Sequence, residues 1–319
     1  MRPPEGERGA ALLTVLMLVA VIAVMAGGAL ERLRLSTRLA GNAGATEQAR
    51  GYAMAAEALA TAKVTDLLGR DRSRVSLAGG WSGQPFGLPL PGGAAIARIT
   101  DGGNCFNLNG LVTEAGPGIY VDNPAERIRF ARLIRLLNIP GQNAESIAAA
   151  TADWIDTDQD QQAQGAEDAV YLARDTPYRT AGTLMVDPSE LRAVAGVTAD
   201  VYAALRPWVC TLPKAAPATI NVNTLLPEQA PLLAMLFRDT VSVGAAQAML
   251  VRRPPLGFAS VNAALQGAAA PEAPAAITST WFRLTIDVGL GQTQLHESAL
   301  IDATSLPARL VSRQWNGDS

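Results

Sequence analysis

Histidine, cysteine and aromatic residues are scarce in this chain. Among 319 residues there are one histidine and two cysteines, and aromatic residues make up 5%. The single histidine, His296, stands beside Glu297 on a predicted strand, which favours a surface or sheet residue over a catalytic base. Neither cysteine belongs to a CxxC pair, no Gly-rich phosphate loop follows a strand, and no GxSxG is present. These absences predict a protein that is not an enzyme.

The chain also lacks a strong net charge. Its 26 Lys and Arg residues against 29 Asp and Glu residues leave a formal charge of −3. Bulk charge therefore gives no reason to expect a nucleic-acid partner. The length permits one large or two ordinary domains.

Charged residues are absent from residues 10–30, which are mostly Ala, Leu, Val, Ile and Met. A run of about 20 such residues can cross a bilayer as a helix. A short hydrophilic leader ending in Arg8-Gly9 precedes it. A secretory signal peptide is one alternative, with a candidate cleavage site at residues 26–29, although the run exceeds the usual apolar length of such signals. A plain signal anchor is another.

The helix is expected to continue beyond the apolar run. Ala53, Ala56, Ala60, Val64 and Leu67 recur at spacings of three and four, which predicts one stripe along a helix. No proline occurs between residues 8 and 84. The pattern favours one long helix, apolar all round at first and amphipathic later. A membrane helix followed by a separate surface helix, with a break near Gly41, stays open.

Several short strands are expected outside this helix. Residues 77–91 are rich in Gly and Pro and predict a loop. Residues 94–101 predict a strand, residues 282–288 and 295–301 a hairpin, and residues 309–315 a further strand. Paired asparagines two apart mark two more strands, at 105–109 and 220–224, and could bond neighbouring backbone.

The two cysteines, Cys105 and Cys210, are expected to form a disulfide if the body lies outside the cytosol. Two buried free thiols are the alternative. A bridge would hold the two Asn-containing strands side by side and make the residues between them an insertion.

That insertion is predicted to be helical, with helices over residues 125–138 and 146–155. The pair at 188–194 and 199–205 resembles a helix-hairpin-helix or SAM-like unit. Its turn at residues 196–200 carries no Lys or Arg, so the DNA-backbone contacts that such hairpins make are not expected. A second small helical unit is predicted at 227–265.

An acidic segment follows the second of these helices. Asp156, Asp158 and Asp160 occupy positions one, three and five of a loop whose position twelve is Glu167, the spacing of oxygen ligands in a calcium loop. Gln161 replaces the glycine expected at position six. We predict a structural Ca²⁺ site, with a solvated acidic loop and a catalytic carboxylate pair as alternatives. The candidate ligands are Asp153, Asp156, Asp158, Asp160, Glu167 and Asp168.

Two sets of residues resemble known families. Arg8-Gly9 followed by Ala10-Ala11-Leu12-Leu13 resembles the class III signal of type IV pilins and type II secretion pseudopilins. A further series resembles protein K of the type II secretion system over most of the chain. It comprises Asp153-Trp154-Ile155-Asp156 with Asp158, Gly165-Ala166-Glu167-Asp168, Tyr171, Pro177-Tyr178-Arg179, Ser189-Glu190-Leu191-Arg192 with Val194 and Gly196-Val197, and Asn221-Val222-Asn223-Thr224.

The first resemblance implies cleavage by prepilin peptidase between Gly9 and Ala10, with Ala10 as the mature N-terminus and a candidate for methylation. Most members of those families carry Glu at the fifth mature position, where this chain has Thr14. In this resemblance the protein K family lacks that Glu, since a subunit at the tip has no subunit above it for the carboxylate to meet.

The resemblance to protein K implies an α+β fold: a pilin-like long N-terminal helix packed on a small antiparallel sheet, with a large α-helical domain inserted. It further implies calcium on that domain and assembly with the minor pseudopilins I and J at the pseudopilus tip, for protein export. The protein would be a single-pass inner-membrane protein with its body in the periplasm. Exported proteins are a further candidate contact, and nucleic acid is not expected. A minor pilin of a type IV pilus and a membrane-tethered helix-hairpin-helix DNA-binding protein are the alternatives.

These expectations divide the chain into six segments. They are a leader (1–9), a transmembrane helix (10–30), a spine helix with the first strands (31–109), an inserted helical domain with the acidic loop (110–217), a returning strand with a second helical unit (218–275), and C-terminal strands (276–319).

Overall fold

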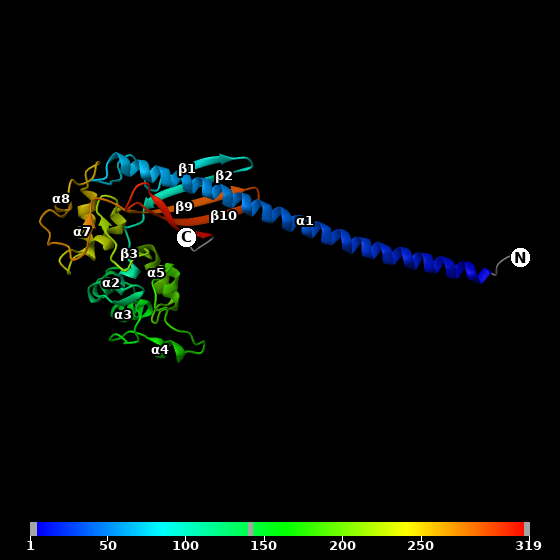
Figure 1. The fold of residues 1–319 in the computed structure, drawn as a ribbon, viewed down its shortest axis with the longest axis horizontal. Coiled ribbons are helices and arrows are strands. Elements are labelled where there is room, and N and C mark those ends of the chain that lie inside the picture. The colour runs from blue at the N-terminus through cyan, green and yellow to red at the C-terminus, as the bar shows by residue number, and fades with distance from the viewer. Residues whose placement is uncertain (1–4, 140–142, 316–319) are drawn as a thin grey trace.

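A single long helix carries a sheet and a helical body at its far end (Figure 1). The structure is a computed structural model, and it describes residues 5–139 and 143–315. Helix α1 (Glu5–Arg70) is 66 residues long. Its N-terminal part extends away from the rest of the molecule as a bare rod.

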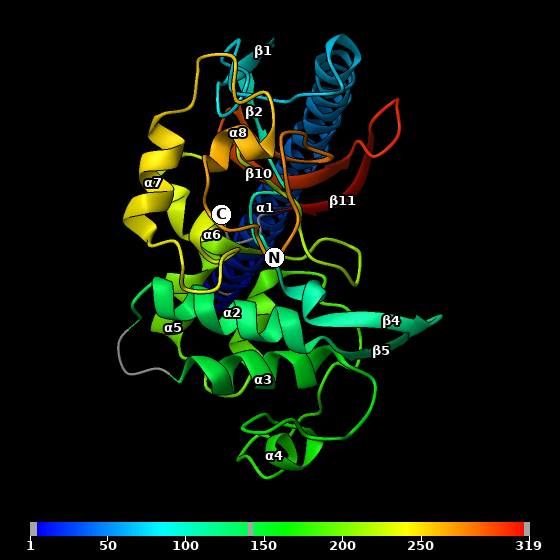
Figure 2. The same cartoon turned by 90° about the vertical axis from the view of Figure 1, so that its left-hand side faces the viewer.

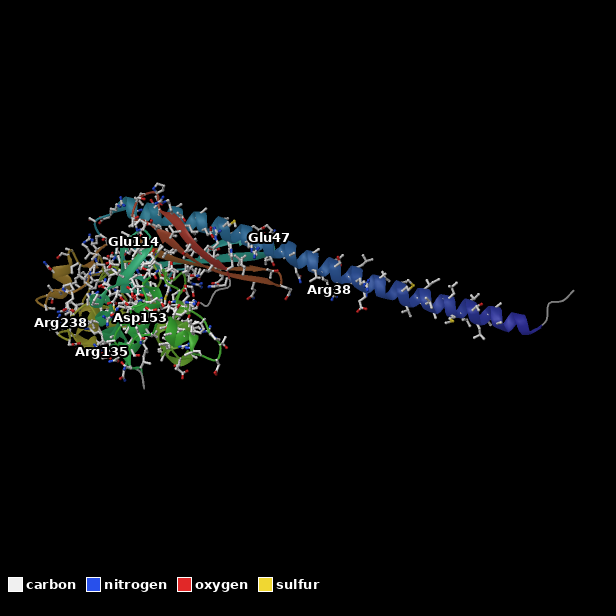
Figure 3. All side chains as sticks on the ribbon, turned by 60° about the horizontal axis from the view of Figure 1, so that its bottom comes forward. Arg38, Glu47, Glu114, Arg135, Asp153 and Arg238 are labelled. Carbon is white, nitrogen blue, oxygen red and sulfur yellow. A yellow bond between two sulfur atoms is a disulfide. The ribbon has the colours of Figure 1, made fainter. Side chains whose placement is uncertain are left out.

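The first part of α1 is exposed on all sides. Every described side chain from Ala10 to Gly44 is exposed, and none of them belongs to a hydrophobic cluster of the described residues. Among the described residues, α1 is the one helix long and apolar enough to cross a membrane. Arg38 and Glu47 lie further along the rod, where it approaches the sheet (Figure 3). The helix runs unbroken through Gly41, so one continuous helix is confirmed and the alternative of two helices is wrong.

The second part of α1 packs on a five-stranded antiparallel sheet. The strands lie in the order β1 (Phe86–Leu90), β2 (Gly93–Asp101), β9 (Trp281–Leu290), β10 (Thr293–Asp302) and β11 (Arg309–Trp315). The predicted strand at 94–101, the hairpin and the last strand are therefore confirmed.

A stripe of small and aliphatic side chains joins this helix to the sheet. Ala53, Ala56 and Ala60 are fully buried and Val64 nearly so, as their spacing predicts. The stripe ends at Leu68, which is 3% exposed, whereas the predicted Leu67 is half-buried. Leu68 keeps the four-residue step from Val64 that holds a side chain on one helix face.

One edge of the sheet departs from the prediction. Residues 77–91 were expected to form a loop, but Phe86–Leu90 forms β1 and pairs with β2. Pro89 is tolerated because β1 is an edge strand, where a missing N–H costs no ladder bond. Gly and Pro content alone therefore concealed a strand.

The long excursion between β2 and β9 forms the helical body (Figure 2). Its helices are α2 (Pro124–Leu136), α3 (Ala144–Ile155), α4 (Asp168–Leu172), α5 (Ala199–Leu205), α6 (Ala230–Ala234), α7 (Val243–Val251) and α8 (Val261–Leu265), with short 3₁₀ turns at Leu108–Leu111, Pro188–Ala193, Arg206–Trp208 and Pro227–Gln229. The predicted helices are present, and the segment expected at 188–194 is a 3₁₀ turn. One hydrophobic cluster, from Phe106 to Leu265, unites the whole excursion.

Several short elements of the body were not predicted. Strands β4 (Val112–Gly116) and β5 (Ile119–Asp122) form a hairpin that projects from the body. Helix α4 follows the acidic loop. Both are short and partly exposed, so their hydrophobic pattern is weak.

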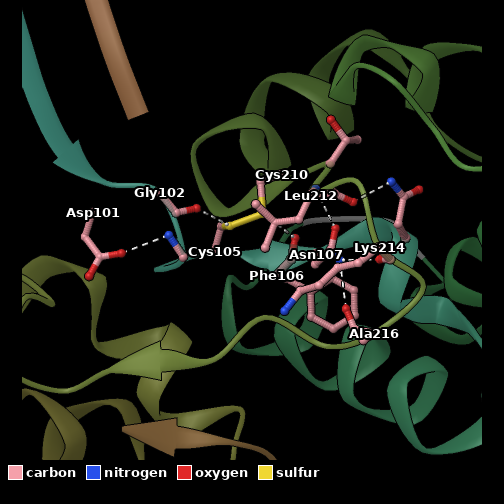
Figure 4. Close-up of a disulfide and its surroundings, with 12 residues drawn as sticks. Asp101, Gly102, Cys105, Phe106, Asn107, Cys210, Leu212, Lys214 and Ala216 are labelled. Atoms are coloured by element: carbon pink, nitrogen blue, oxygen red, sulfur yellow. Dashed lines mark hydrogen bonds between the residues drawn. A yellow bond between two sulfur atoms is a disulfide. The ribbon is translucent and has the colours of Figure 1, made fainter. Parts of the chain in front are cut away.

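A disulfide joins the two ends of the first half of the excursion. Cys105 and Cys210 are bridged, with their Cα atoms 5.8 Å apart (Figure 4). Beside the bridge, β3 (Phe106–Asn107) pairs in parallel with β6 (Val209–Cys210). The two Asn-containing strands do not form a ladder with each other, because β7 (Ile220–Asn221) pairs with β8 (Ala275–Ala276). The side chain of Asn104, next to Cys105, bonds the backbone N–H and carbonyl of Asn221, so the two segments do lie side by side as expected.

The asparagines themselves behave as predicted. Asn107 donates to the carbonyls of Lys214 (3.1 Å) and Ala216 (2.8 Å), as Figure 4 shows. The side-chain amide of Asn221 donates to the carbonyl of Val75 over 3.0 Å. Buried backbone groups need such partners, so the amide side chains take over bonding that the short strands leave unmade.

Candidate metal centre

Three buried carboxylates converge where α3 ends and α4 begins. Asp153 lies in the last turn of α3, and Asp156 is the residue that caps its C-terminus. Glu167 caps the N-terminus of α4 after the acidic loop. Asp153 lies in the helical body (Figure 3). The spacing of three places Asp153 and Asp156 on the same side of the helix end, and the loop returns Glu167 to them.

The three side chains form one compact group. A carboxylate oxygen from each of Asp153, Asp156 and Glu167 lies within 4.8 Å of the others, and this is the one such group among the residues that the structure describes. Their exposed fractions are 0%, 1% and 3%. Gly165 permits the close approach of the loop, since a Cβ there would lie 2.0 Å from Asp153 Oδ2.

Donors within the protein do not balance this charge. Asp153 accepts the backbone N–H of Gln162, at 3.3 Å from each carboxylate oxygen. All four carboxylate oxygens of Asp156 and Glu167 are buried and have no hydrogen-bond donor in the described chain. Buried anions of this kind need a proton or a cation.

Burial and mutual repulsion raise the pKa of all three groups. Burial raises the pKa of Asp153 to about 6. Burial, with the charges of Asp158 and Glu167, raises the pKa of Asp156 to about 8. Burial, with the charges of Asp153 and Asp158, raises the pKa of Glu167 to about 7. Without a cation the group holds protons near neutral pH.

The donor set suits a hard divalent cation. Six oxygen atoms from three carboxylates supply the ligands that Ca²⁺ prefers, and one oxygen from each residue already lies within 4.8 Å of the others. No Cys or His stands in this group, so a soft-metal site is not indicated. The residues present therefore fit a calcium ion.

The other predicted ligands lie outside the group of three. Asp158 and Asp160 are exposed, and Asp158 Oδ1 accepts the backbone N–H of Asp160. Asp168 accepts Thr180 N (2.9 Å) and pairs with Arg179. Backbone bonding to Thr180 lowers the pKa of Asp168 against the effect of burial. Metal ligation by these three residues stays a prediction.

The loop is tied to the projecting hairpin and to an aromatic cluster. Thr157, next to Asp156, donates its N–H to the carbonyl of Tyr120 on β5 over 3.0 Å. Trp154 packs edge-on against Tyr171, with ring centroids 5.4 Å apart. Gly165 and the aromatic neighbours were not recognised as part of the site from the sequence. For Gly165, the sequence signal was its position two residues before the candidate ligand Glu167, where a glycine can mark a close approach of the backbone.

The predicted processing site lies on α1. Gly9 and Ala10 both fall within the helix, and Thr14 bonds its hydroxyl to the carbonyl of Ala11 over 2.9 Å. Residues 1–4 of the predicted leader are outside the described residues.

Two family models describe the chain, both named type II secretion system protein K. One matches residues 104–214 and the other residues 220–284. Type II secretion system protein K of Pectobacterium carotovorum subsp. carotovorum is 34% identical over 98% of this chain and 97% of that protein. The protein of the same name from Aeromonas hydrophila is 35% identical over the same shares.

A solved structure shares the fold. A chain in the crystal structure of the GspK-GspI-GspJ complex from the enterotoxigenic Escherichia coli type 2 secretion system superposes with a TM-score of 0.73. It is 31% identical in sequence, and the match covers 86% of this chain and 97% of that one. The inserted body therefore belongs to the shared fold, because a match of this extent includes it.

Proposed function

The chain belongs to the type II secretion system protein K family, and on this premise we propose that it is a minor pseudopilin at the tip of the pseudopilus. One observation carries the proposal. A single helix has an exposed apolar half and a half packed on a small sheet, with a large body at the end far from the apolar half. Its work is assembly rather than catalysis.

The shape of the molecule supports the tip position. The body extends beyond the sheet at the end of α1 opposite the apolar segment (Figure 1). A subunit inside a filament needs the end of its helix opposite the apolar segment to be free for the next subunit. A subunit at the tip does not, so a large body can lie there. Thr14 supports the same position, because its hydroxyl is satisfied inside its own helix and needs no partner above or below.

The partners follow from the family. The solved relative is a complex of GspK, GspI and GspJ, and we assign pseudopilins I and J of the same organism as partners of this chain. Exported proteins are a further contact for the body. Together the three subunits would initiate or cap the pseudopilus that drives export across the outer membrane.

The apolar half of α1 anchors the protein in the inner membrane, with the body in the periplasm. Prepilin peptidase cuts between Gly9 and Ala10 and leaves the anchor in place. The bridge between Cys105 and Cys210 agrees with an oxidising compartment. Mass spectrometry of the purified protein should find Ala10 as the first residue; a first residue near Ala29 would mean signal-peptide cleavage.

The acidic group binds one structural Ca²⁺ through Asp153, Asp156 and Glu167. Support comes from the burial of the three carboxylates and from the four oxygens without donors. The ion would neutralise the group and fix the acidic loop between α3 and α4. Elemental analysis of protein purified with calcium should find the metal, and its absence would reject the site.

Co-purification tests the assembly. The full-length chain, extracted in mild detergent, should carry untagged pseudopilins I and J through affinity and size-exclusion steps. A matched control, the major pseudopilin alone in place of I and J, should not elute with it. Failure of I and J to co-elute would contradict the proposed function.

A further inference from the structure

Three charged side chains meet between the spine helix and the last two strands. Glu57 comes from α1, Glu297 from β10 and Arg313 from β11. Glu57 is 6% exposed and Glu297 is fully buried. The cluster therefore holds two buried carboxylates against one guanidinium, and it lies far from the acidic group of the helical body.

The guanidinium of Arg313 forms its hydrogen bonds here with Glu57 and not with Glu297. Arg313 donates through both Nε and Nη2 to the two oxygens of Glu57. Its Nε is 3.7 Å from Glu297 Oε1, too far for a hydrogen bond. Both oxygens of Glu297 are buried without a donor in the described chain, and Arg313 Nε lies within ion-pair distance of the carboxyls of both Glu297 and Glu57.

No second cation reaches this cluster among the described residues. On the sheet, Glu297 stands opposite Ile286 of β9 and Trp315 of β11. Arg50 of α1 lies over the Trp315 ring, with its guanidinium carbon 6.0 Å from the ring centroid, and pairs with Glu47. Arg313 alone faces both carboxylates from the three elements packed here.

Two adjacent buried carboxylates cannot both stay ionised beside one cation without a large penalty. A single proton removes the difficulty. We propose that Glu57 and Glu297 share one proton, with Glu297 as the neutral acid that donates to Glu57 and Arg313 as the counter-charge of Glu57. The cluster is then neutral. It links the spine helix to the two C-terminal strands through Glu57, Glu297 and Arg313, and we call this proton-dependent contact the latch.

The protonation behaviour agrees with this geometry. Burial, with the hydrogen bond and charge of Glu57, raises the pKa of Glu297 to about 9. Burial acts against ionisation of Glu57 too, but the hydrogen bonds of Arg313 leave its pKa lowered. Because the pKa of Glu297 is higher in the folded state than in the unfolded state, the latch loses stability as pH rises toward about 9.

The test is thermal unfolding of the full-length protein in detergent from pH 5 to pH 10, in EDTA so that the acidic group stays metal-free. The wild-type Tm should fall between pH 7 and pH 10 by about 5 °C. Glu297→Gln keeps an N–H donor to Glu57 but cannot ionise, so its Tm at pH 7 should equal or exceed that of the wild type. The Tm of Glu297→Gln should fall less between pH 7 and pH 10 than the Tm of the wild type.

Two further variants separate a shared proton from simple burial. Glu57→Gln frees Arg313 to pair with Glu297, so the fall in Tm above about pH 8, beyond the pKa values of the metal-free acidic group, should vanish although the protein is less stable. Glu228→Gln, at an exposed residue, should keep the wild-type profile.

Infrared spectroscopy at pH 7 should show neutral carboxylic-acid absorption, and the difference spectrum between wild type and Glu297→Gln should contain one such band beyond those of the metal-free acidic group. An unchanged spectrum, or a Glu297→Gln variant with the full wild-type fall, would overturn the proposal. A fall in Tm above about pH 8 that persists in Glu57→Gln would show that Glu297 is merely buried, and would overturn the sharing.

Discussion

At the scale of single residues, Asp156 and Glu167 matter most, since they are buried as acids with no donors around them. Their chain spacing suggested a calcium loop, and that part of the prediction led to the right region. The same spacing gave equal weight to Asp158 and Asp160, which the structure places in solvent. Spacing in sequence cannot say which carboxylates turn inward, because that depends on how the loop packs on α3.

Replacing Asp156 tests the metal centre directly. Wild-type protein should gain about 5 °C in Tm on addition of calcium at 100 times Kd, from the linkage of binding to folding. Asp156→Asn should remove most of that gain. It should also raise the Tm in EDTA, because it relieves repulsion among buried acids. Asp160→Asn is the matched control, and calcium should still stabilise it. Equal calcium responses in the two variants would contradict the assignment.

Calcium affinity should depend strongly on pH. Asp156 and Glu167 have pKa values raised to about 8 and about 7, and their protons must leave when the cation binds. Titration calorimetry should give a Kd at least about tenfold weaker at pH 6 than at pH 8.

Without metal, the sign of the pH dependence of stability is opposite. The raised pKa values mean that the folded state holds protons that the unfolded state has lost, so stability falls as pH rises from about 4 to about 8.

For the calcium titration, an affinity independent of pH would show that these groups are not the ligands.

Gly165 should not tolerate a side chain. The methyl group of Gly165→Ala would meet Asp153 Oδ2 at 2.0 Å, so the loop or Asp153 must shift. We expect a loss of about 1–3 kcal/mol in stability, with weaker calcium binding. Gly244→Ala is the control: Gly244 lies on α7, and a Cβ there would have Ser242 Oγ as its nearest atom, 4.0 Å away. This variant should be neutral or slightly stabilising. Chemical denaturation of both variants would measure the difference.

At the scale of elements, hydrophobic periodicity predicted the long regular ones and failed on the short ones. The stripe from Ala53 to Val64 predicted the packed face of α1, and the alternation in residues 282–301 predicted the central hairpin. Strand β1 was missed because Gly87 and Pro89 stand between its alternating apolar residues and suggest a loop. The β4–β5 hairpin was missed because exposed strands carry little apolar alternation. The pairing of β3 with β6 was not predicted either, because a two-residue strand has no pattern that specifies its neighbour.

The disulfide should contribute much of the stability at the junction between sheet and body. The strands beside it, β3 and β6, pair over only two residues, while the bridge spans a sequence separation of 105. Closing so long a loop is worth roughly 4 kcal/mol in the chain-entropy description.

The double variant Cys105→Ser with Cys210→Ser should therefore lose several kcal/mol in urea unfolding. Reduction of the wild type should match it. Identical midpoints for oxidised wild type and the double variant would show that the β3–β6 junction holds without the bridge.

At the scale of the whole molecule, the arrangement separates three tasks along one axis. The exposed apolar part of α1 meets the membrane, its packed part supports the sheet, and the excursion between β2 and β9 forms the body (Figure 1). The order of these parts was predictable from the sequence, since each has its own composition. The single hydrophobic cluster that unites both helical units was not, because contacts between residues far apart in sequence leave no periodic pattern.

The central claim is that this chain joins two other minor pseudopilins at a tip. Native mass spectrometry of the full-length chain co-expressed with pseudopilins I and J of its own organism measures this most directly. We expect one species containing a single copy of each of the three proteins. A spectrum with only the free chain, or with the chain repeated in a homopolymer, would contradict it.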